Sequence, residues 1–335
     1  MNVAFFLAAD AFEQIYGDEC FRAASELGRV LGPPLTDPEL SSNPPPWLDQ
    51  VEAIFTGWGG PRLDRALLRR MPKLKVAFYG AGSLRAVLTD ESWDSGIVFA
   101  NAAALNAVPT AEFAFGSILL SLKRAWQQAA QVRARRAYPK SLAEVSKYLP
   151  GGYGSTVGLV SLGLVGRRVA QWLANTDVNV VAYDPFAKAD ELASLKVRRV
   201  SLDELFATAD VISLHTPLLP ETTGMIGQKL LSSMKTGATL INTSRGAVVR
   251  EDEMIATLRA RPDLQAIVDV TDPEPPSPDS PLFDLPNVFL TPHIAGSLGP
   301  ECRRMGRAMI EEFQRFLRGQ PLAYEIRREH LARTA

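Results

Sequence analysis

The feature of this sequence that most limits its possible folds is a repeated alternation of short apolar runs with stretches of helical spacing. Residues 3–7 form an apolar run, and residues 13–27 place their apolar side chains at helical spacing. The alternation continues with strand-like runs at 53–55, 74–79 and 97–99 and a helical stretch at 62–70. Strands that alternate with helices predict a parallel sheet covered by helices, which is an α/β fold.

Two stretches interrupt this alternation in the first half of the chain. The proline-rich residues 32–46 are expected to form a loop without a helix or a central strand, because proline lacks the amide donor that both need. From Pro109 to Tyr138 the only breaker after the first turn is Gly116, which predicts one long helix of about 45 Å. Such a helix would reach a second domain or subunit; the alternative is an ordinary core helix with a solvated end.

The alternation restarts after a glycine-rich connector at residues 151–154. Further strand-like runs follow at 156–160, 178–183, 211–214, 238–242, 266–270 and 288–290. A last helix, residues 300–317, comes after this series and is expected to return to the first half of the chain. A length of 335 residues fits two domains better than one.

The composition argues against several classes of partner. The net charge is −1, from 36 basic and 37 acidic residues, so no nucleic-acid partner is expected. Cys20 and Cys302 are far apart, which argues against a disulfide framework or a thiolate metal site. Residues 3–9 lack the basic flank of a signal peptide, and no apolar run reaches the roughly 18 residues that a membrane helix needs. A cytoplasmic protein without membrane contact is expected.

The stretch from residue 156 to 184 reads as strand, glycine turn, helix, strand and terminal acid. Gly163 and Gly166 lie in the turn, where small residues let a pyrophosphate approach the helix N-terminus. Ser161 replaces the usual first glycine, which is expected to weaken or reposition cofactor binding. Asp184 would accept hydrogen bonds from ribose hydroxyls and repel a 2′-phosphate, which predicts NAD rather than NADP. A simple turn opened by Asp184 is the alternative.

The three histidines differ in their positions relative to the predicted strands. His293 follows the run 288–290, and ligands of open α/β sheets bind beyond the carboxyl ends of the strands. His215 also ends a strand; it either lines the cofactor or is a satisfied structural histidine. His330 lies in a charged tail and is expected to be a solvated surface residue. His293 is therefore the candidate for catalysis.

Arg245 follows the predicted strand 238–242, and Glu274 follows the predicted strand 266–270. These two strands come before 288–290, the strand that precedes His293. An arginine can hold a substrate carboxylate bidentately and polarise a carbonyl. A histidine can give a proton to the developing alkoxide, while a glutamate orients the ring and favours its charged form. The three residues together predict a site for carbonyl reduction, and a surface salt bridge is the alternative for Arg245 and Glu274.

Four segments extend this pattern: 215–218 with 221–224, 241–247, 269–270 with 274–275, and 291–296. In their order and spacing the chain resembles the D-isomer-specific 2-hydroxyacid dehydrogenase family, which includes glycerate, phosphoglycerate and hydroxypyruvate-type enzymes. The resemblance implies two Rossmann-like, doubly wound parallel-sheet domains with the active site in the cleft between them. It places a substrate domain at residues 1–104, completed by 297–335, and an NAD-binding domain at 105–296.

The resemblance also implies an NAD-dependent oxidoreductase that interconverts a 2-oxo acid and its D-2-hydroxy acid, acting as a homodimer to which the long helix contributes. Arg245, Glu274 and His293 take the catalytic roles, and the backbone of Ala81 and Gly82 joins Arg245 in binding substrate. Cofactor contacts are implied at Gly163, Leu164, Val165, Gly166, Asp184, Thr216, Thr243 and Asp269. The alternative is an NAD(H)-responsive, corepressor-like binding protein of the same fold with little or no turnover.

The sequence departs from the family pattern in the loop after Gly82. The family commonly has an acidic residue where this chain has Leu84, followed by Arg85. Arg85 is expected to face the cleft and favour substrates with an extra anionic group; the alternative is that it replaces a structural contact. Formate and phosphite dehydrogenases are disfavoured, because the first carry Gln in place of Glu274 and the second Lys in place of Ala81.

Overall fold

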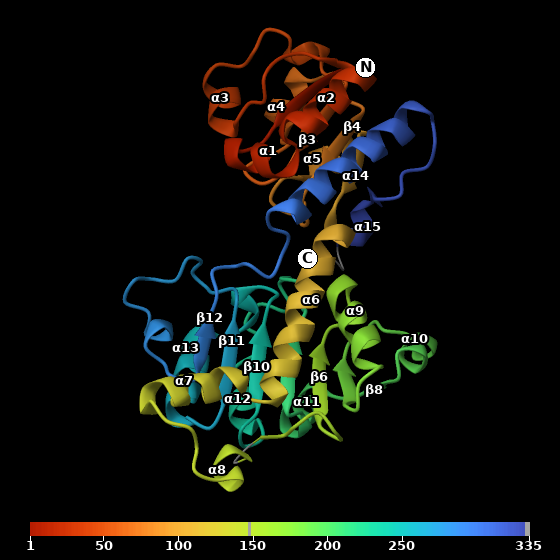
Figure 1. The fold of residues 1–335 in the computed structure, drawn as a ribbon. Coiled ribbons are helices and arrows are strands. Elements are labelled where there is room, and N and C mark those ends of the chain that lie inside the picture. Colours follow the sequence, from red (N-terminus) through yellow and green to blue (C-terminus); the bar gives the residue numbers. More distant parts are fainter. Residues whose placement is uncertain (147–148, 332–335) are drawn as a thin grey trace. The chain divides into compact units, whose positions relative to one another are not determined.

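The computed structural model describes residues 1–146 and 149–331, apart from the side chains of residues 330 and 331. Contacts divide the chain into two compact units (Figure 1). Unit 1 consists of Met1–Pro109 with Gly296–Ala335, and unit 2 of Thr110–Ala295. The domain boundaries expected from the sequence lie after residues 104 and 296, whereas along the chain the two units meet after residues 109 and 295. The prediction for His330 concerns a side chain outside the described ones.

In the described part of unit 1, six strands form one sheet in the order β13-β5-β4-β3-β1-β2. They are β1 (Asn2–Phe6), β2 (Arg29–Val30), β3 (Ala53–Thr56), β4 (Val76–Tyr79), β5 (Val98–Asn101) and β13 (Glu325–Ile326). Its helices are α1 (Ala9–Ile15), α2 (Gly17–Leu27), α3 (Asp37–Ser42), η1 (Leu48–Gln50), α4 (Arg65–Arg70), α5 (Asp90–Asp94), α14 (Pro300–Leu317) and α15 (Arg328–Leu331). Strands β1 to β5 pair in parallel, and β13 runs antiparallel to β5.

Aromatic rings fill one face of the sheet in unit 1. Phe5 of β1 stacks on Phe55 of β3 with ring centroids 4.9 Å apart, and Phe55 stacks on Phe78 of β4 at 5.2 Å. Phe313 of α14 meets Phe78 edge-on at 5.7 Å. Large buried rings supply much of the apolar area that stabilises such a core. The last helix therefore packs on the first half of the chain, as the sequence predicts.

In the described part of unit 2, seven parallel strands form a sheet in the order β12-β11-β10-β9-β6-β7-β8. They are β6 (Thr156–Val160), β7 (Asn179–Tyr183), β8 (Val197–Arg199), β9 (Val211–Leu214), β10 (Thr239–Asn242), β11 (Gln265–Val268) and β12 (Val288–Leu290). Its helices are α7 (Ala125–Arg135), α8 (Leu142–Ser146), α9 (Leu164–Leu173), α10 (Ala189–Ser194), α11 (Leu202–Thr208), α12 (Gln228–Ser233), η2 (Gly246–Val248), α13 (Glu251–Ala260) and η3 (Pro281–Phe283). The strand order reverses between β6 and β9, as in a doubly wound Rossmann-type sheet.

Helices cover both faces of the sheet in unit 2. Val157 and Leu159 of β6 pack with α9 and with the second half of α6 (Ala103–Leu122), whereas Val160 packs with the helices on the other side. Successive side chains of a strand point to opposite faces, so a fully buried parallel strand needs apolar residues at every position. The continuous apolar runs in the sequence have this origin.

The loop at residues 32–46 contains a short helix, which the sequence analysis excluded. Helix α3 begins after Thr36, whose side chain forms a capping box with Glu39. Pro38 stands in the first turn of this helix, where a missing amide donor costs nothing. The expectation was wrong because proline disrupts the interior of a helix but is tolerated in its first turn.

The single long helix predicted from Pro109 to Tyr138 is also wrong. Helix α6 begins at Ala103 and ends at Leu122, and α7 begins at Ala125 after a turn in which Arg124 has a φ of 48°. The buried guanidinium of Arg124 donates to the carbonyl oxygens of Gly237 at 3.3 Å and Asp263 at 2.8 Å. These contacts with distant loops of unit 2 hold the turn, and nothing local in the sequence signals them.

Helix α6 has the length and composition of a membrane-spanning helix, which the sequence analysis did not foresee. Ala111, Ala114, Ile118 and Leu122 are buried in the core of unit 2, against the strands and α9. A core helix covered by the rest of an α/β unit is apolar for the same reason that a membrane helix is. Burial accounts for the apolar residues on this face, but only 39% of the apolar window of α6 is buried, and Leu119 and Leu120 are exposed.

Candidate functional site

The candidate residues of unit 2 follow strands whose carboxyl ends lie at one edge of the sheet. The register pairs Val160 with Leu214, Leu214 with Asn242, Asn242 with Val268, and Val268 with Leu290. The loops that start after these positions therefore begin side by side. Since β6 and β9 flank the reversal of strand order, the glycine turn and His215 stand at the position where doubly wound sheets bind ligands.

The glycine turn between β6 and α9 has the geometry of a nucleotide-binding turn. Ser161 adopts a φ of 77°, a left-handed conformation that costs a residue with a Cβ about 1–2 kcal/mol. A Cβ at Gly166 would overlap the carbonyl oxygen of Ser161, so helix and strand can approach this closely only at a glycine. A Cβ at Gly163 would meet nothing within 4 Å, which leaves open space over the start of α9. At this start Leu164 is exposed and Val165 half-buried.

Asp184 joins the end of β7 to the glycine turn. One of its carboxylate oxygens accepts the N–H of Leu162 at 2.7 Å, and the other accepts the N–H groups of Phe186 at 2.7 Å and Ala187 at 2.9 Å. The carboxylate is half-buried and fixed in place by backbone donors. Asp184 therefore opens a turn, as the alternative interpretation holds. The same bonds also fix its carboxylate beside the glycine turn.

Buried polar atoms without partners gather near the carboxyl ends of β9 and β10. Among the described residues, neither ring nitrogen of His215 has a hydrogen-bond partner, and the same holds for Oγ1 of Thr243. Burial lowers the pKa of His215 to about 4, so the ring is neutral at pH 7. Thr216 differs, because its hydroxyl donates to the carbonyl oxygen of Val160 at 3.3 Å. Buried polar groups usually have partners, so orphaned ones at a strand edge indicate a place where a polar ligand binds.

His293 and Glu274 meet at the same edge of the sheet. Nδ1 of His293 lies 2.5 Å from Oε1 of Glu274, and the two side chains are 47% and 41% exposed. The contact leaves Nε2 of the ring as the nitrogen that can face a substrate. The structure thus brings together two of the three residues that the sequence selects for catalysis.

Asp269 holds the loop that carries His293. Its Oδ1 accepts the hydroxyl of Thr291 at 2.6 Å and the N–H of Ile294 at 2.9 Å, while Oδ2 accepts the N–H of Ala295 at 2.9 Å. His293 itself has a φ of 54°, an unfavourable conformation that these bonds on both sides of it maintain. Sequence reasoning placed Asp269 only among the cofactor contacts and missed this anchoring role, which its position directly after β11 could have suggested.

Two contacts fix the loop that carries Glu274. The carboxylate of Glu251, at the start of α13, accepts the N–H of Asp272 at 3.0 Å. Burial raises the pKa of Glu251, and the negative charge of Asp272 adds to the effect. Gly246 packs so closely on the backbone of Thr271 that a Cβ would overlap its carbonyl group. Neither contact was foreseen, because both join segments that are distant in the sequence.

Arg245 stands in the loop after β10, next to the loop after β11. Its side chain is half-buried, and one guanidinium nitrogen donates to the carbonyl oxygen of Ser244 at 2.6 Å. The side-chain amide of Asn242 donates to the backbone oxygen of Arg245 at 3.0 Å. These bonds fix the backbone of the loop and restrict the guanidinium, as a substrate-binding arginine requires.

The predicted substrate loop belongs to unit 1, after β4. The carbonyl oxygen of Ala81 accepts the N–H of Ala102 at 3.0 Å, and that of Gly82 accepts the side-chain amide of Asn101 at 2.9 Å. Within the described chain, no acceptor is paired with the N–H groups of Ala81 and Gly82. Unpaired backbone N–H groups in a loop with fixed carbonyl groups suit an anion such as a carboxylate. Arg85 follows at an exposed position.

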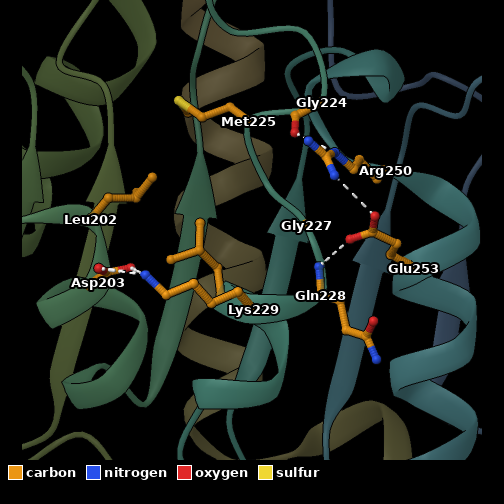
Figure 2. Close-up of a pocket in the computed structure, with 10 residues that line it drawn as sticks. Leu202, Asp203, Gly224, Met225, Gly227, Gln228, Lys229, Arg250 and Glu253 are labelled. Carbon is orange, nitrogen blue, oxygen red and sulfur yellow. Dashed lines mark hydrogen bonds and ion pairs between the residues drawn. The ribbon is translucent and has the colours of Figure 1, made fainter.

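A shallow pocket of about 290 Å³ lies elsewhere in unit 2, at the first turns of α11, α12 and α13 (Figure 2). Its ionic side chains pair with one another: Lys229 lies 3.0 Å from Asp203, and Arg250 lies 3.1 Å from Glu253. Glu253 also accepts the N–H of Gln228. The pocket contains no member of the candidate site, and its charges are already neutralised.

Comparisons with known proteins agree on one family. The model of the "D-isomer specific 2-hydroxyacid dehydrogenase, NAD binding domain" matches residues 115–295. A glyoxylate reductase of Korarchaeum cryptofilum is 31% identical over 258 residues, which cover 77% of each chain. A D-3-phosphoglycerate dehydrogenase of Archaeoglobus fulgidus is 31% identical over 261 residues, 78% of this chain and 49% of that protein.

The chain therefore spans about half the length of the phosphoglycerate dehydrogenases that it matches. Among solved structures, apo D-mandelate dehydrogenase of Rhodotorula graminis is 25% identical with a TM-score of 0.79, and 97% of each chain is covered. The likeness to that structure thus extends over both units, whereas the family model covers only the second.

Proposed function

Because the chain belongs to the D-isomer specific 2-hydroxyacid dehydrogenase family, we propose that it is an NAD-dependent oxidoreductase that interconverts a 2-oxo acid and its D-2-hydroxy acid. The observation that carries this proposal is the contact between His293 and Glu274 at the ligand-binding edge of an NAD-binding domain. A paired histidine in that position has the chemistry of a proton donor and acceptor.

The residues at the sheet edge fit the dinucleotide. The open space at Gly163 and the close helix approach at Gly166 suit a pyrophosphate, and Asp184 suits the adenosine ribose of NAD. Thr243, with its orphaned hydroxyl, and Thr216 would line the rest of the cofactor together with Leu164, Val165 and Asp269. When bound, the nicotinamide ring supplies or accepts the hydride, and the chain's own residues handle binding and the proton.

His293 transfers the proton that accompanies the hydride. Glu274 holds Nδ1, so the proton on Nε2 of the imidazolium is available to the oxygen of the 2-oxo group during reduction. In the reverse direction the neutral Nε2 removes the proton from the substrate hydroxyl. The carboxylate of Glu274 stabilises the cationic ring and fixes its tautomer, as in other carboxylate–histidine pairs.

Arg245 and the loop of Ala81 and Gly82 would bind the substrate carboxylate. A guanidinium offers parallel donors to two carboxylate oxygens, and backbone N–H groups add donors without a mobile side chain. The half-buried Arg245 and the unpaired N–H groups of the loop support these roles. Holding the carboxylate fixes the adjacent 2-oxo carbon for hydride transfer.

The test is NADH oxidation with a panel of 2-oxo acids: glyoxylate, hydroxypyruvate, pyruvate and bulkier members. Turnover of at least one acid with NADH, and a much slower reaction with NADPH, is the expected result, because Asp184 would repel a 2′-phosphate. The product is expected to be the D-2-hydroxy acid, which a stereospecific enzymatic assay identifies. Tight NADH binding without turnover of any acid would overturn the proposal and favour a corepressor-like binding protein.

We also propose that the chain forms a homodimer. Tyr138, Leu142 and Tyr153 lie in the segment between α7 and β6, and their exposed fractions are 85%, 86% and 89%. Large apolar side chains that are exposed to this extent are typical of an association surface. Sedimentation equilibrium is expected to give twice the chain mass of 36.5 kDa, and a Tyr138→Ser, Leu142→Ser double variant is expected to move it towards the monomer.

A further inference from the structure

Trp58 is an exposed indole at an otherwise buried strand end in unit 1. All four residues of β3 are buried, whereas the side chain of Trp58, two positions after Thr56, is 37% exposed. The order of this sheet reverses between β1 and β3, because β2 lies on one side of β1 and β3 on the other. Ligands of open α/β sheets bind beyond the carboxyl ends of the strands at such a reversal. Trp58 therefore stands at the ligand-binding position of unit 1.

The turn that carries Trp58 is fixed by its surroundings. Gly59 has a φ of 68°, and a Cβ there would lie 2.6 Å from the Cβ of Ala8. A Cβ at Gly60 would overlap the hydroxyl of Thr56. The carbonyl oxygen of Trp58 accepts the N–H of Ala8 at 3.0 Å. Close packing and this bond leave the turn one backbone shape, which presents the indole from a rigid support.

The predicted carboxylate loop begins at the same edge, one strand away. Thr56 of β3 is in register with Tyr79 of β4, and Gly80 donates to the carbonyl oxygen of Thr56 at 2.8 Å. The loop with Ala81 and Gly82 thus starts beside the turn of Trp58. On the other side of the turn Ala8 has a small side chain. Unit 1 thereby brings unpaired backbone N–H groups and one exposed aromatic side chain to the same edge of its sheet.

We propose that Trp58 determines substrate specificity and selects 2-oxo acids whose side chain is apolar, above all aromatic, such as phenylpyruvate. This inference rests on the proposed function and adds to it the substrate class. An indole offers a flat apolar face, on which an aromatic ring gains both buried area and a favourable ring–ring contact. A substrate as small as glyoxylate has no side chain to place there, so Trp58 contributes little to its reaction.

Arg85 supports a different class, acids with a second anionic group. Arg85 stands at an exposed position, and its long charged side chain has more rotatable bonds than an indole. The indole of Trp58 has fewer rotatable bonds and a rigid turn beneath it, so the observations favour the aromatic class. The experiment also measures whether the protein prefers acids with a second anionic group.

The experiment compares kcat/KM for phenylpyruvate, glyoxylate and 2-oxoglutarate in the wild type, Trp58→Ala and Trp58→Phe. Trp58→Ala is expected to lower kcat/KM for phenylpyruvate by about 10- to 100-fold and for glyoxylate by less than about threefold, since side-chain contacts in a pocket discriminate to this degree. Trp58→Phe is expected to retain most of the phenylpyruvate activity, because it keeps an aromatic face. Phe283→Ala removes another exposed aromatic, 57% exposed, and is the control with no effect on specificity.

Equal losses on phenylpyruvate and glyoxylate would overturn the inference while leaving the proposed function intact. So would a wild type that prefers 2-oxoglutarate and loses this preference in Arg85→Ala. If no acid is reduced, the proposed function fails, and calorimetric titration of phenylpyruvate still tests Trp58. Binding to the wild type that Trp58→Ala weakens about tenfold or more supports the subsite, and absent or unchanged binding rejects it. Thermal unfolding within a few degrees of the wild type shows that Trp58→Ala is folded.

Discussion

The two units share an architecture but differ in what stands at the carboxyl edges of their sheets. In unit 2 this edge carries ionisable side chains, above all the pair of His293 and Glu274. In unit 1 the corresponding edge carries unpaired backbone N–H groups, small residues and Trp58. A parallel sheet brings several strand ends to one edge whatever its loops contain. The residue types in the loops then decide which chemistry is available at that edge.

The turns at these edges differ in how they meet a positive φ. After β3 the left-handed position is held by Gly59, with a φ of 68°, and after β6 it is held by Ser161, with a φ of 77°. Glycine adopts this region without steric cost, whereas serine is strained there. The turn after β6 thus carries backbone strain that the turn after β3 avoids.

The largest expected effect is at His293. His293→Asn removes the proton donor and is expected to lower kcat by about 10³-fold, within the range that general acid–base catalysis supplies. NADH binding, measured by fluorescence titration, is expected to change little, because the glycine turn is untouched. Glu274→Gln is expected to give a smaller loss, since the ring remains. If His293→Asn turned over substrate as fast as the wild type, the proton transfer would not depend on this edge of the sheet.

The two glycines of the cofactor turn are expected to separate packing from binding. Gly166→Ala forces a Cβ against the carbonyl oxygen of Ser161 and is expected to destabilise the fold by about 1–3 kcal/mol and to weaken NADH binding. Gly163→Ala meets nothing within 4 Å, so thermal stability is expected to stay unchanged while NADH binding falls. Equal NADH affinity in wild type and Gly163→Ala would contradict the placement of the pyrophosphate.

His215 is expected to make the stability of the apoprotein depend on pH. Burial lowers its pKa to about 4 in the folded chain, whereas an unfolded histidine titrates near its ordinary value of 6.5. Between these values the unfolded state binds the extra proton, so the free energy of unfolding falls as the pH falls through this window. His215→Gln, neutral at all pH values, is expected to lose about 2–3 kcal/mol less than the wild type between pH 7 and 4.5 in urea unfolding. Parallel pH profiles would show that burial of the ring has no such cost.

The smallest expected effect tests the strain at Ser161 directly. Ser161→Gly relieves the left-handed φ and is expected to stabilise the apoprotein by up to about 1 kcal/mol, after the entropy cost of glycine in the unfolded chain. Lys196 also has a positive φ, 56°, at an exposed position in unit 2 outside the site, so Lys196→Gly is the matched control. NADH affinity is expected to rise only in Ser161→Gly. Identical NADH affinities in both variants would show that Ser161 does not disturb the cofactor turn.

Much of the fold and of the candidate site could be predicted because short-range patterns carry them. Buried parallel strands need continuous apolar runs, and the runs in the sequence match most strands of both sheets. His293, Arg245 and Glu274 could be selected because each follows such a run. The break after α6 could not be predicted, since Arg124 adopts its conformation through bonds to Gly237 and Asp263, over a hundred positions away.

The sequence by itself determined the α/β class, the strand ends on which the ionisable residues stand, and the family to which they belong. Local spacing suffices for these, because strand period, turn residues and motif order are all read along the chain. Only the tertiary structure decided that His293 contacts Glu274, that Asp269 holds the loop of His293, and that Trp58 stands exposed at a reversal of strand order. These depend on which strands become neighbours, a choice made by packing across the sheet and not by adjacent residues.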